Sequence, residues 1–237
     1  MLIKPKDWYS EDYFYPNTRH YTDQYGVTRE YKGPSKDWNG FSYIANFIKD
    51  NFIGVETIND IGCSAGAFVA RSIEMGFKTK GCDISDFAIN NCLEGARGHV
   101  VEVDITKYES MKKSDMVVSF DLMEHIYEKD LNDALAFITG SCKSGGWIFL
   151  CIATARNQNE IWSHPDEDTI VPPDRTWLAV SGHVHIRTID WWIKKLESCG
   201  FTTNYEKMMH FHLWRARHST MRDVESWGIG NVYIGRL

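Results

Sequence analysis

The chain has 237 residues, of which 43% are hydrophobic and 24% charged, and a formal net charge of −6. These values indicate a globular chain at the upper end of one domain, with enough apolar residues for a sizeable core. They argue against a membrane-spanning protein, because apolar runs reach only strand length, and against one that grips long nucleic acid by overall charge.

The six cysteines form no C-x-x-C pair and no zinc-ligand spacing, which predicts buried, reduced side chains. The first residues, Met1–Trp8, lack an apolar signal core. We therefore expect a cytoplasmic protein.

The first 50 residues contain 12 of the 32 aromatic residues, with seven basic and seven acidic side chains. Disordered tails are poor in aromatic residues, so we expect a packed arm. It is either a strap across the sheet or a dimer contact, or else a lid in which aromatic rings and Arg19 or His20 close over a ligand. The aromatic residues in question include Trp8, Tyr9, Tyr13, Phe14, Tyr15, Tyr21, Tyr25, Tyr31 and Trp38.

Residues 57–66 (TINDIGCSAG) predict a strand that runs into a glycine turn, where Gly62 and Gly66 let the backbone approach a ligand. The dinucleotide pattern G-x-G-x-x-G is absent, because Ser64 and Ala67 stand where glycines are needed. Asp60 would repel a pyrophosphate but suits an ammonium group. The turn therefore favours S-adenosylmethionine (SAM) over NAD.

Later strands end in further acidic residues. Lys78–Ser85 ends near Asp83, 23 residues after Asp60, where an acid accepts hydrogen bonds from ribose hydroxyls. A third strand brings Asp104 and Ile105 to positions suited to an adenine amino group and ring face. The remaining strands of this region are expected at Val100–Asp104, Asp115–Phe120 and Trp147–Ala153. The helices that alternate with the strands are expected at Ala67–Met75, Asp86–Glu94 and Asp130–Lys143.

This alternation predicts a parallel sheet with its ligand at the carboxyl ends of the strands. A turn at Ser144–Gly146 should release the fifth strand. Beyond it lies a long insertion, Ala155–Arg187, which we expect to recognise substrate because long irregular loops are usually functional. A helix over Thr188–Ser198 and strands over Thr202–Lys207 and Asn231–Gly235 complete the expected elements.

These motifs in this order resemble the class I SAM-dependent methyltransferases. The resemblance rests on Asp60-x-Gly62-x-x-x-Gly66, on Asp83 and Asp104, and on the segment Asp121–Ile126. It implies an α/β fold with a Rossmann-like, doubly wound, seven-stranded sheet whose last strand is antiparallel, formed by residues 51–237 behind the arm. It also implies SAM as cofactor, bound by Asp60, Gly62, Cys63, Ser64, Gly66, Asp83, Ile84, Asp104, Ile105, Phe120 and Asp121.

Methyl transfer to a hydroxyl needs a general base, and histidine suits that role at neutral pH. His125 follows the fourth strand, where a helix should begin, and His183 and His185 would share a face of a strand. We therefore expect these three histidines to be catalytic. The acceptor is expected to be a small molecule methylated at oxygen, and a homodimer stays open.

Two alternatives remain. Asp121, Glu124, His125 and His183 resemble the metal site of small-RNA 2′-hydroxyl methyltransferases, although no metal ligand is assigned because the Glu-His pair also occurs in metal-free relatives. The second alternative is a non-catalytic SAM-binding subunit that works through the arm.

The geometry of the fold further predicts that residues 8–43 and 155–187 form the two walls of the acceptor site, with His125 and His183 or His185 at its floor.

Overall fold

A computed structural model describes residues 9–14, 19–22, 28–31, 40–172, 182–217 and 231–237. Several residues named above lie outside these ranges, namely Trp8, Tyr15, Tyr25 and Trp38, and so do residues 173–181 of the insertion. The backbone of the arm is described at Arg19–Thr22 and Thr28–Tyr31, but the side chains of Arg19, His20, Tyr21 and Tyr31 are not.

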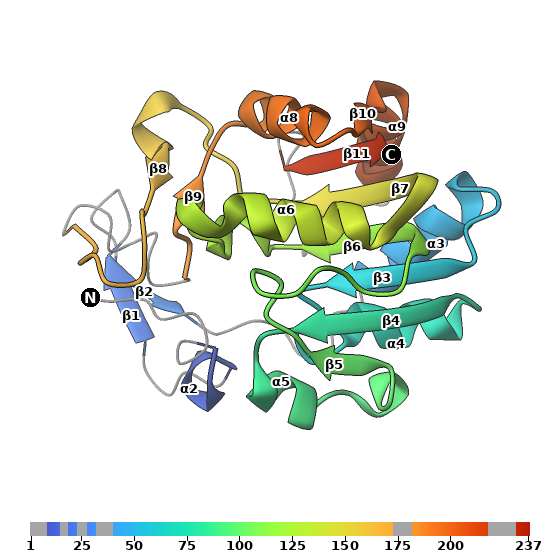
Figure 1. The fold of residues 1–237 in the computed structure, drawn as a ribbon, viewed down its shortest axis with the longest axis horizontal. Coiled ribbons are helices and arrows are strands. Elements are labelled where there is room, and N and C mark those ends of the chain that lie inside the picture. The colour runs from blue at the N-terminus through green and yellow to red at the C-terminus, as the bar shows by residue number, and fades with distance from the viewer. Residues whose placement is uncertain (1–8, 15–18, 23–27, 32–39, 173–181, 218–230) are drawn as a thin grey trace.

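A seven-stranded sheet with the order β10-β11-β7-β6-β3-β4-β5 forms the centre of the fold (Figure 1). The strands from β3 to β7 pair in parallel, whereas β11 is antiparallel to both of its neighbours. This confirms the predicted α/β sheet and its antiparallel last strand. The strands are β3 (Thr57–Ile61), β4 (Lys78–Asp83), β5 (Val100–Glu102), β6 (Ser114–Phe120), β7 (Cys142–Cys151), β10 (Thr202–Thr203) and β11 (Val232–Arg236).

Helices cover both faces of this sheet, with α6 in front and α3 and α4 behind (Figure 1). In β6 every residue from Met116 to Phe120 is buried, as expected for a parallel strand covered on two faces. The main helices are α3 (Gly40–Asn51), α4 (Ala67–Glu74), α5 (Asp86–Asn90), α6 (Leu131–Gly140), α8 (Ile189–Ser198) and α9 (Tyr205–Arg217). The shorter elements are α2 (Glu11–Phe14), the hairpin of β1 (Arg19–Thr22) and β2 (Thr28–Tyr31), and the pair β8 (Trp162–Ser163) and β9 (His185–Ile186).

Three local predictions were wrong. The strand expected over Thr202–Lys207 ends at Thr203, because Met208, Phe211 and His212 bury the inner face of a helix that begins at Tyr205. The expected turn at Ser144–Gly146 lies inside β7, where the pairing with β6 shifts register. The helix expected after Asp121 is only a single 3₁₀ turn, Met123–His125.

The end of the arm belongs to the core. Residues 40–50 form most of α3, on which Ile44, Phe47 and Ile48 are at most 1% exposed. The Phe47 ring contacts Phe149 of β7 and Phe211 of α9. The part of the arm that is separate from the core therefore precedes Gly40.

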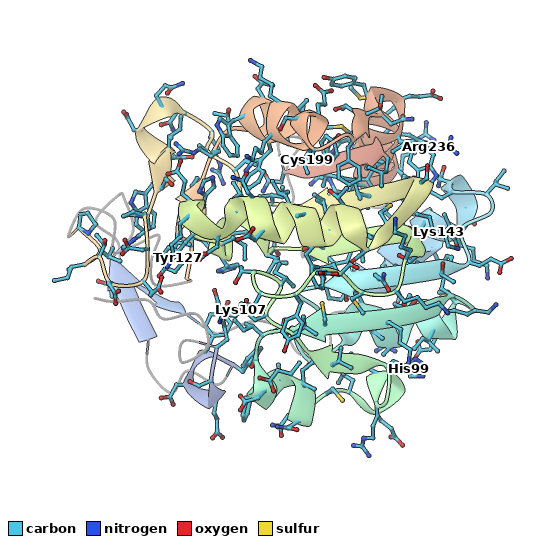
Figure 2. All side chains as sticks on the ribbon, viewed as in Figure 1. His99, Lys107, Tyr127, Lys143, Cys199 and Arg236 are labelled. Carbon is cyan, nitrogen blue, oxygen red and sulfur yellow. The ribbon has the colours of Figure 1, made fainter. Side chains whose placement is uncertain are left out.

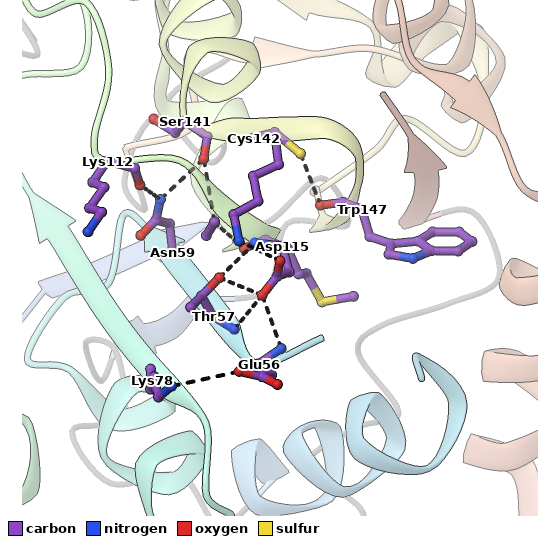
Figure 3. A network of polar contacts seen from close by, with 12 residues as sticks. Glu56, Thr57, Asn59, Lys78, Lys112, Asp115, Ser141, Cys142 and Trp147 are labelled. Atoms are coloured by element: carbon purple, nitrogen blue, oxygen red, sulfur yellow. Dashed lines mark hydrogen bonds and ion pairs between the residues drawn. The ribbon is translucent and has the colours of Figure 1, made fainter. Parts of the chain in front are cut away.

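A polar network ties together the amino-terminal ends of the central strands (Figure 3). Asp115 Oδ2 accepts hydrogen bonds from Thr57 Oγ1 at 2.6 Å and Thr57 N at 2.8 Å, and Asp115 Oδ1 pairs with Lys143 Nζ at 2.7 Å. Asn59 Nδ2 donates to the Ser141 carbonyl at 3.2 Å. Strands β3, β6 and β7 are thus held together at their amino-terminal ends, and their carboxyl ends lie together on the opposite side of the sheet.

Candidate functional site

The turn after β3 has a backbone that only glycine adopts without strain. Gly62 and Gly66 have φ values of 78° and 79°, and Ser64 between them has a φ of 52°. A Cβ at Gly62 would lie 2.9 Å from Leu122 Cδ2, and one at Gly66 would lie 2.5 Å from Ala96 Cβ. Gly66 is therefore required by space as well as by backbone conformation, whereas Gly62 is required mainly by its positive φ, because the atoms that crowd it belong to the flexible Leu122 side chain.

Asp60 lies at the end of β3 with a carboxylate that is not fully satisfied. Its side chain is 2% exposed, and Oδ1 has no hydrogen-bond partner within the described ranges. Burial, together with the neighbouring Asp83, raises the pKa of Asp60 well above its usual value. A ligand ammonium group at this carboxylate would offset the cost of burying it, so the residue fits the methionine moiety of SAM.

Asp83 connects the turn to the end of β4. Its Oδ2 accepts a hydrogen bond from Ser64 N at 2.8 Å, and its Oδ1 accepts one from Ser85 N at 2.9 Å. Each carboxylate oxygen has a second lone pair, which suffices for ribose hydroxyls. Asp83 therefore orders the turn in addition to the role expected from the sequence, and Ile84 lies half-buried beside it.

Asp104 is occupied by local partners. Its Oδ1 accepts hydrogen bonds from Thr106 N at 3.1 Å and Thr106 Oγ1 at 2.6 Å, and Lys107 pairs with Oδ2. Burial raises the pKa of Asp104, but the hydrogen bonds from Lys107 and Thr106 outweigh it and lower the pKa overall. Ile105 is 7% exposed and packs into the main core. An adenine amino group would have to share this carboxylate with Lys107.

Phe120 and Asp121 lie where β6 reaches the turn. Phe120 packs against the rings of Phe41 and Phe68, and Asp121 has a φ of 51°, a strained value for a residue with a side chain. Cys63 is buried, and burial raises the pKa of its thiol well above the usual value. Cys63 therefore stays protonated at neutral pH and lines the turn without acting as a nucleophile.

Beyond Asp121, the 3₁₀ turn brings Glu124 and His125 close to His183. One ligand-type atom from each of the three side chains lies within 4.8 Å of the others, and the two imidazole rings are 5.0 Å apart. Burial lowers the pKa of His125 to about 4 and that of His183 to about 3, so both imidazoles are neutral at pH 7. Leu122, two residues before Glu124, packs over Gly62 and so links this cluster to the glycine turn.

His185 is not part of the cluster. It lies in β9, whereas His183 precedes the strand, so the two do not share a strand face as expected. The His185 ring is 0% exposed, packs between Trp191 and Trp192, and lies 3.2 Å from Ser163 Oγ through Nδ1. Its surroundings are those of a core side chain.

Two further groups contact the cluster, one from the predicted lid and one from the insertion, although neither was singled out individually as a site residue. The Gly182 carbonyl lies 3.0 Å from His125 Nδ1, and the Tyr9 ring meets His125 edge-on at 5.7 Å. Ser85 Oγ donates to the Tyr9 carbonyl at 2.6 Å, which fastens the arm beside Asp83. Gly182, with a φ of 81°, gave a weak local signal as a glycine before a histidine, and Tyr9 gave none beyond being aromatic.

The arm and the insertion both lie on the side to which the parallel strands point (Figure 1). Tyr13 and Phe14 pack on Phe87 and Ala88 of α5. From the insertion, Val184 N donates to the Glu124 carbonyl at 2.8 Å. The described residues of the arm and those of the insertion therefore both contact the cluster of Glu124, His125 and His183.

Comparisons with known proteins agree with this geometry. Residues 58–146 match a family described as a methyltransferase domain. A search of curated proteins found no match. No helix in the described part of the chain has the length and apolar character of a bilayer span.

Three solved structures have similar folds at low sequence identity. An O-methyltransferase family protein from Burkholderia thailandensis is 11% identical, with a TM-score of 0.55, and the match covers 82% of this chain and 55% of that one. A SAM-dependent methyltransferase from Archaeoglobus fulgidus is 17% identical, with a TM-score of 0.54, and the match covers 83% and 94%. An N-methyltransferase from Haemonchus contortus, solved with phosphomonomethylethanolamine and S-adenosylhomocysteine, is 14% identical, with a TM-score of 0.53 and coverage of 84% and 51%.

The chain thus spans only about half the length of the first and third of these proteins, and the three include both O- and N-methyltransferases. What they share with it is the fold. Over residues 58–146 the chain matches the methyltransferase domain family, and the sheet order together with the turn at Asp60, Gly62, Gly66 and Asp83 is that of the class I SAM-dependent methyltransferase fold.

Proposed function

We propose that this protein transfers a methyl group from SAM to a hydroxyl oxygen of a small-molecule acceptor. The observation that carries the proposal is the cluster of Glu124, His125 and His183, which follows the cofactor turn directly at the carboxyl edge of the sheet. A thiolate or an amine would need only alignment, whereas a hydroxyl must lose its proton, and this cluster provides groups that can assist that loss.

When bound, SAM supplies an electrophilic methyl group on a sulfonium. The protein would hold it through Asp60 at the ammonium group, the Gly62–Gly66 backbone and Asp83 at the ribose. Because a carbonyl can only accept, His125 Nδ1 donates to Gly182, and Nε2 is left with a lone pair. Tyr9 lies over the same ring and would exclude water from the acceptor side.

The arm supports the lid alternative over the strap alternative. Its described residues contact α5 and His125 at the carboxyl edge. An aromatic wall contributes contact area at small entropy cost and suits an apolar or sugar-like acceptor. The acidic net charge is unfavourable for an RNA acceptor.

The test combines binding with turnover. Calorimetry should show SAM and S-adenosylhomocysteine binding in the micromolar range, and methyl-labelled SAM with a cell extract should place label in the small-molecule fraction as an O-methyl group. Label in RNA would favour the RNA alternative. Binding without turnover would favour the non-catalytic subunit, and no binding at millimolar cofactor would refute the proposal.

A further inference from the structure

We infer that Glu124, His125 and His183 form a binding site for one divalent transition-metal ion. The inference rests on how the three side chains are placed. A carboxylate oxygen and two imidazole nitrogens lie within 4.8 Å of one another, which is close enough for all three to reach a single ion.

Glu124 provides the first independent indication. Its side chain is 0% exposed, and its Oε1 accepts a hydrogen bond from Ala153 N at 3.1 Å. Its Oε2 has no hydrogen-bond partner among the residues that the structure describes. A buried carboxylate oxygen without a partner is costly, and a cation bound there would remove the cost. The Ala153 contact also fixes the direction of the second oxygen.

His125 provides the second indication. A metal-bound histidine commonly donates its other ring N–H to a backbone carbonyl, which fixes the ring and its tautomer. His125 Nδ1 makes this contact with the Gly182 carbonyl at 3.0 Å, so Nε2 can bind the ion. Gly182 directly precedes His183, and one turn of the chain therefore positions both imidazoles.

The ligand set indicates the class of ion. Two nitrogens and one oxygen suit Zn²⁺, Fe²⁺, Co²⁺ or Mn²⁺, whereas Ca²⁺ and Mg²⁺ prefer sites built from oxygen alone. Both histidine residues keep some solvent exposure, and three protein ligands would leave one coordination position for a further ligand. Three protein ligands with an open position are the pattern of sites that bind a further ligand.

The role of the ion, unlike its binding, rests on the proposed function. An acceptor hydroxyl that occupies the open position would lose its proton to solvent and keep the O–H electron pair, because the ion stabilises the resulting alkoxide.

Metal binding is tested on the full chain without any acceptor. Chelator-stripped protein is titrated with Zn²⁺ by calorimetry and with Co²⁺ by visible absorption. We expect one ion per chain and a Co²⁺ spectrum of low coordination number. His183→Ala and Glu124→Gln should each weaken binding at least about tenfold, since each removes one of three ligands.

The control is His99→Gln. His99 lies on the side of the sheet opposite Tyr127, which follows shortly after the cluster residues Glu124 and His125 (Figure 2), so this variant should bind both ions as the wild type does. S-adenosylhomocysteine affinity reports that each variant is folded. No saturable binding, or binding that His183→Ala leaves unchanged, would overturn the inference.

Failure of this inference and failure of the proposed function give different results. Turnover that resists chelator, in protein that binds no ion, refutes the metal site and leaves O-methylation by a metal-free histidine pair. Stoichiometric metal binding that depends on His183, without methyl transfer to any small molecule, supports the site and refutes the proposed function.

Discussion

Gly66 and Gly54 share a left-handed backbone but differ in their surroundings. Their φ values are 79° and 86°, yet a Cβ at Gly66 would lie 2.5 Å from Ala96 Cβ, whereas one at Gly54 would meet nothing within 4 Å. We expect Gly54→Ala to cost only the backbone strain, about 1 kcal/mol. Gly66→Ala should cost about 1–3 kcal/mol more in urea unfolding, because α4 or its neighbour must move.

Gly66→Ala should also weaken S-adenosylhomocysteine binding in calorimetry, since the turn would shift, while Gly54→Ala should not. Equal affinity in the two variants would mean that the turn tolerates a side chain and that its glycines are not needed for the ligand.

A second prediction at the residue scale concerns Asp83. Its carboxylate orders the turn through Ser64 N and Ser85 N and is proposed to bind ribose hydroxyls. Asp83→Ala should weaken SAM binding by ~1–3 kcal/mol, as expected for the loss of hydrogen bonds to a charged group. Asp86→Ala, which removes an exposed carboxylate on the adjoining helix, is the control. Unchanged affinity in Asp83→Ala would exclude Asp83 from the site.

At the scale of elements, deleting the arm before Gly40 and deleting helix α3 as well should have different effects. The described arm contacts α5 and His125, whereas Ile44, Phe47 and Ile48 of α3 belong to the main core. Deleting residues 1–39 should abolish methyl transfer and leave a folded chain that binds SAM. Deleting residues 1–51 should prevent folding, because large buried side chains are lost.

Circular dichroism, calorimetry and turnover together check this series. Normal turnover after deletion of residues 1–39 would show that the arm is a strap and that the acceptor site is complete without it.

The elements also show what the sequence could predict. The alternation of strands and helices, the turn after β3 and the acidic residues at the strand ends follow from local patterns: apolar periodicity, glycine spacing and the position of each acid after a strand. The contacts that complete the site are not local. His125 meets a carbonyl 57 residues away, and Ser85 meets the Tyr9 backbone 76 residues away.

Tyr205–Arg217 shows a different limit. Thr202 and Thr203 favour a strand, and the residues that follow were read as its continuation. The helix is stabilised by tertiary burial of Met208 and Phe211 against the rest of the core, which overrides a short local pattern. His185 was assigned to the site for a similar reason, because strand alternation was extended over a segment in which only His185–Ile186 is a strand.

At the scale of the whole molecule, Asp115 should contribute to acid sensitivity. Burial raises its pKa, but hydrogen bonds from Lys143, Thr57 and Glu56 outweigh burial and hold the pKa well below the usual range. The unfolded chain therefore binds this proton more readily than the folded chain does. The stabilisation is present above about pH 4 and is lost as the pH falls through the folded-state pKa.

Urea unfolding at pH 7 and at pH 3 should show this loss, and Asp115→Asn should reduce the difference between them. The reduction is expected to be at most about 2 kcal/mol, since the Asp115 side chain is 23% exposed and solvent screens its ion pair. S-adenosylhomocysteine affinity at pH 7 should stay unchanged, because the network lies at the opposite edge of the sheet. An identical pH dependence in variant and wild type would contradict the prediction.

The position of β11 between β7 and β10 has a consequence for synthesis of the chain. The strand is formed by Val232–Arg236, so β7 has no neighbour on that side until those residues have left the ribosome. Residues 148–152, at the end of β7, are all apolar or sulfur-containing. An unpaired strand of this kind pairs readily with other chains. A nascent chain halted before Asn231 would therefore expose the unpaired side of β7, and chaperone protection would matter until the residues of β11 have been synthesised.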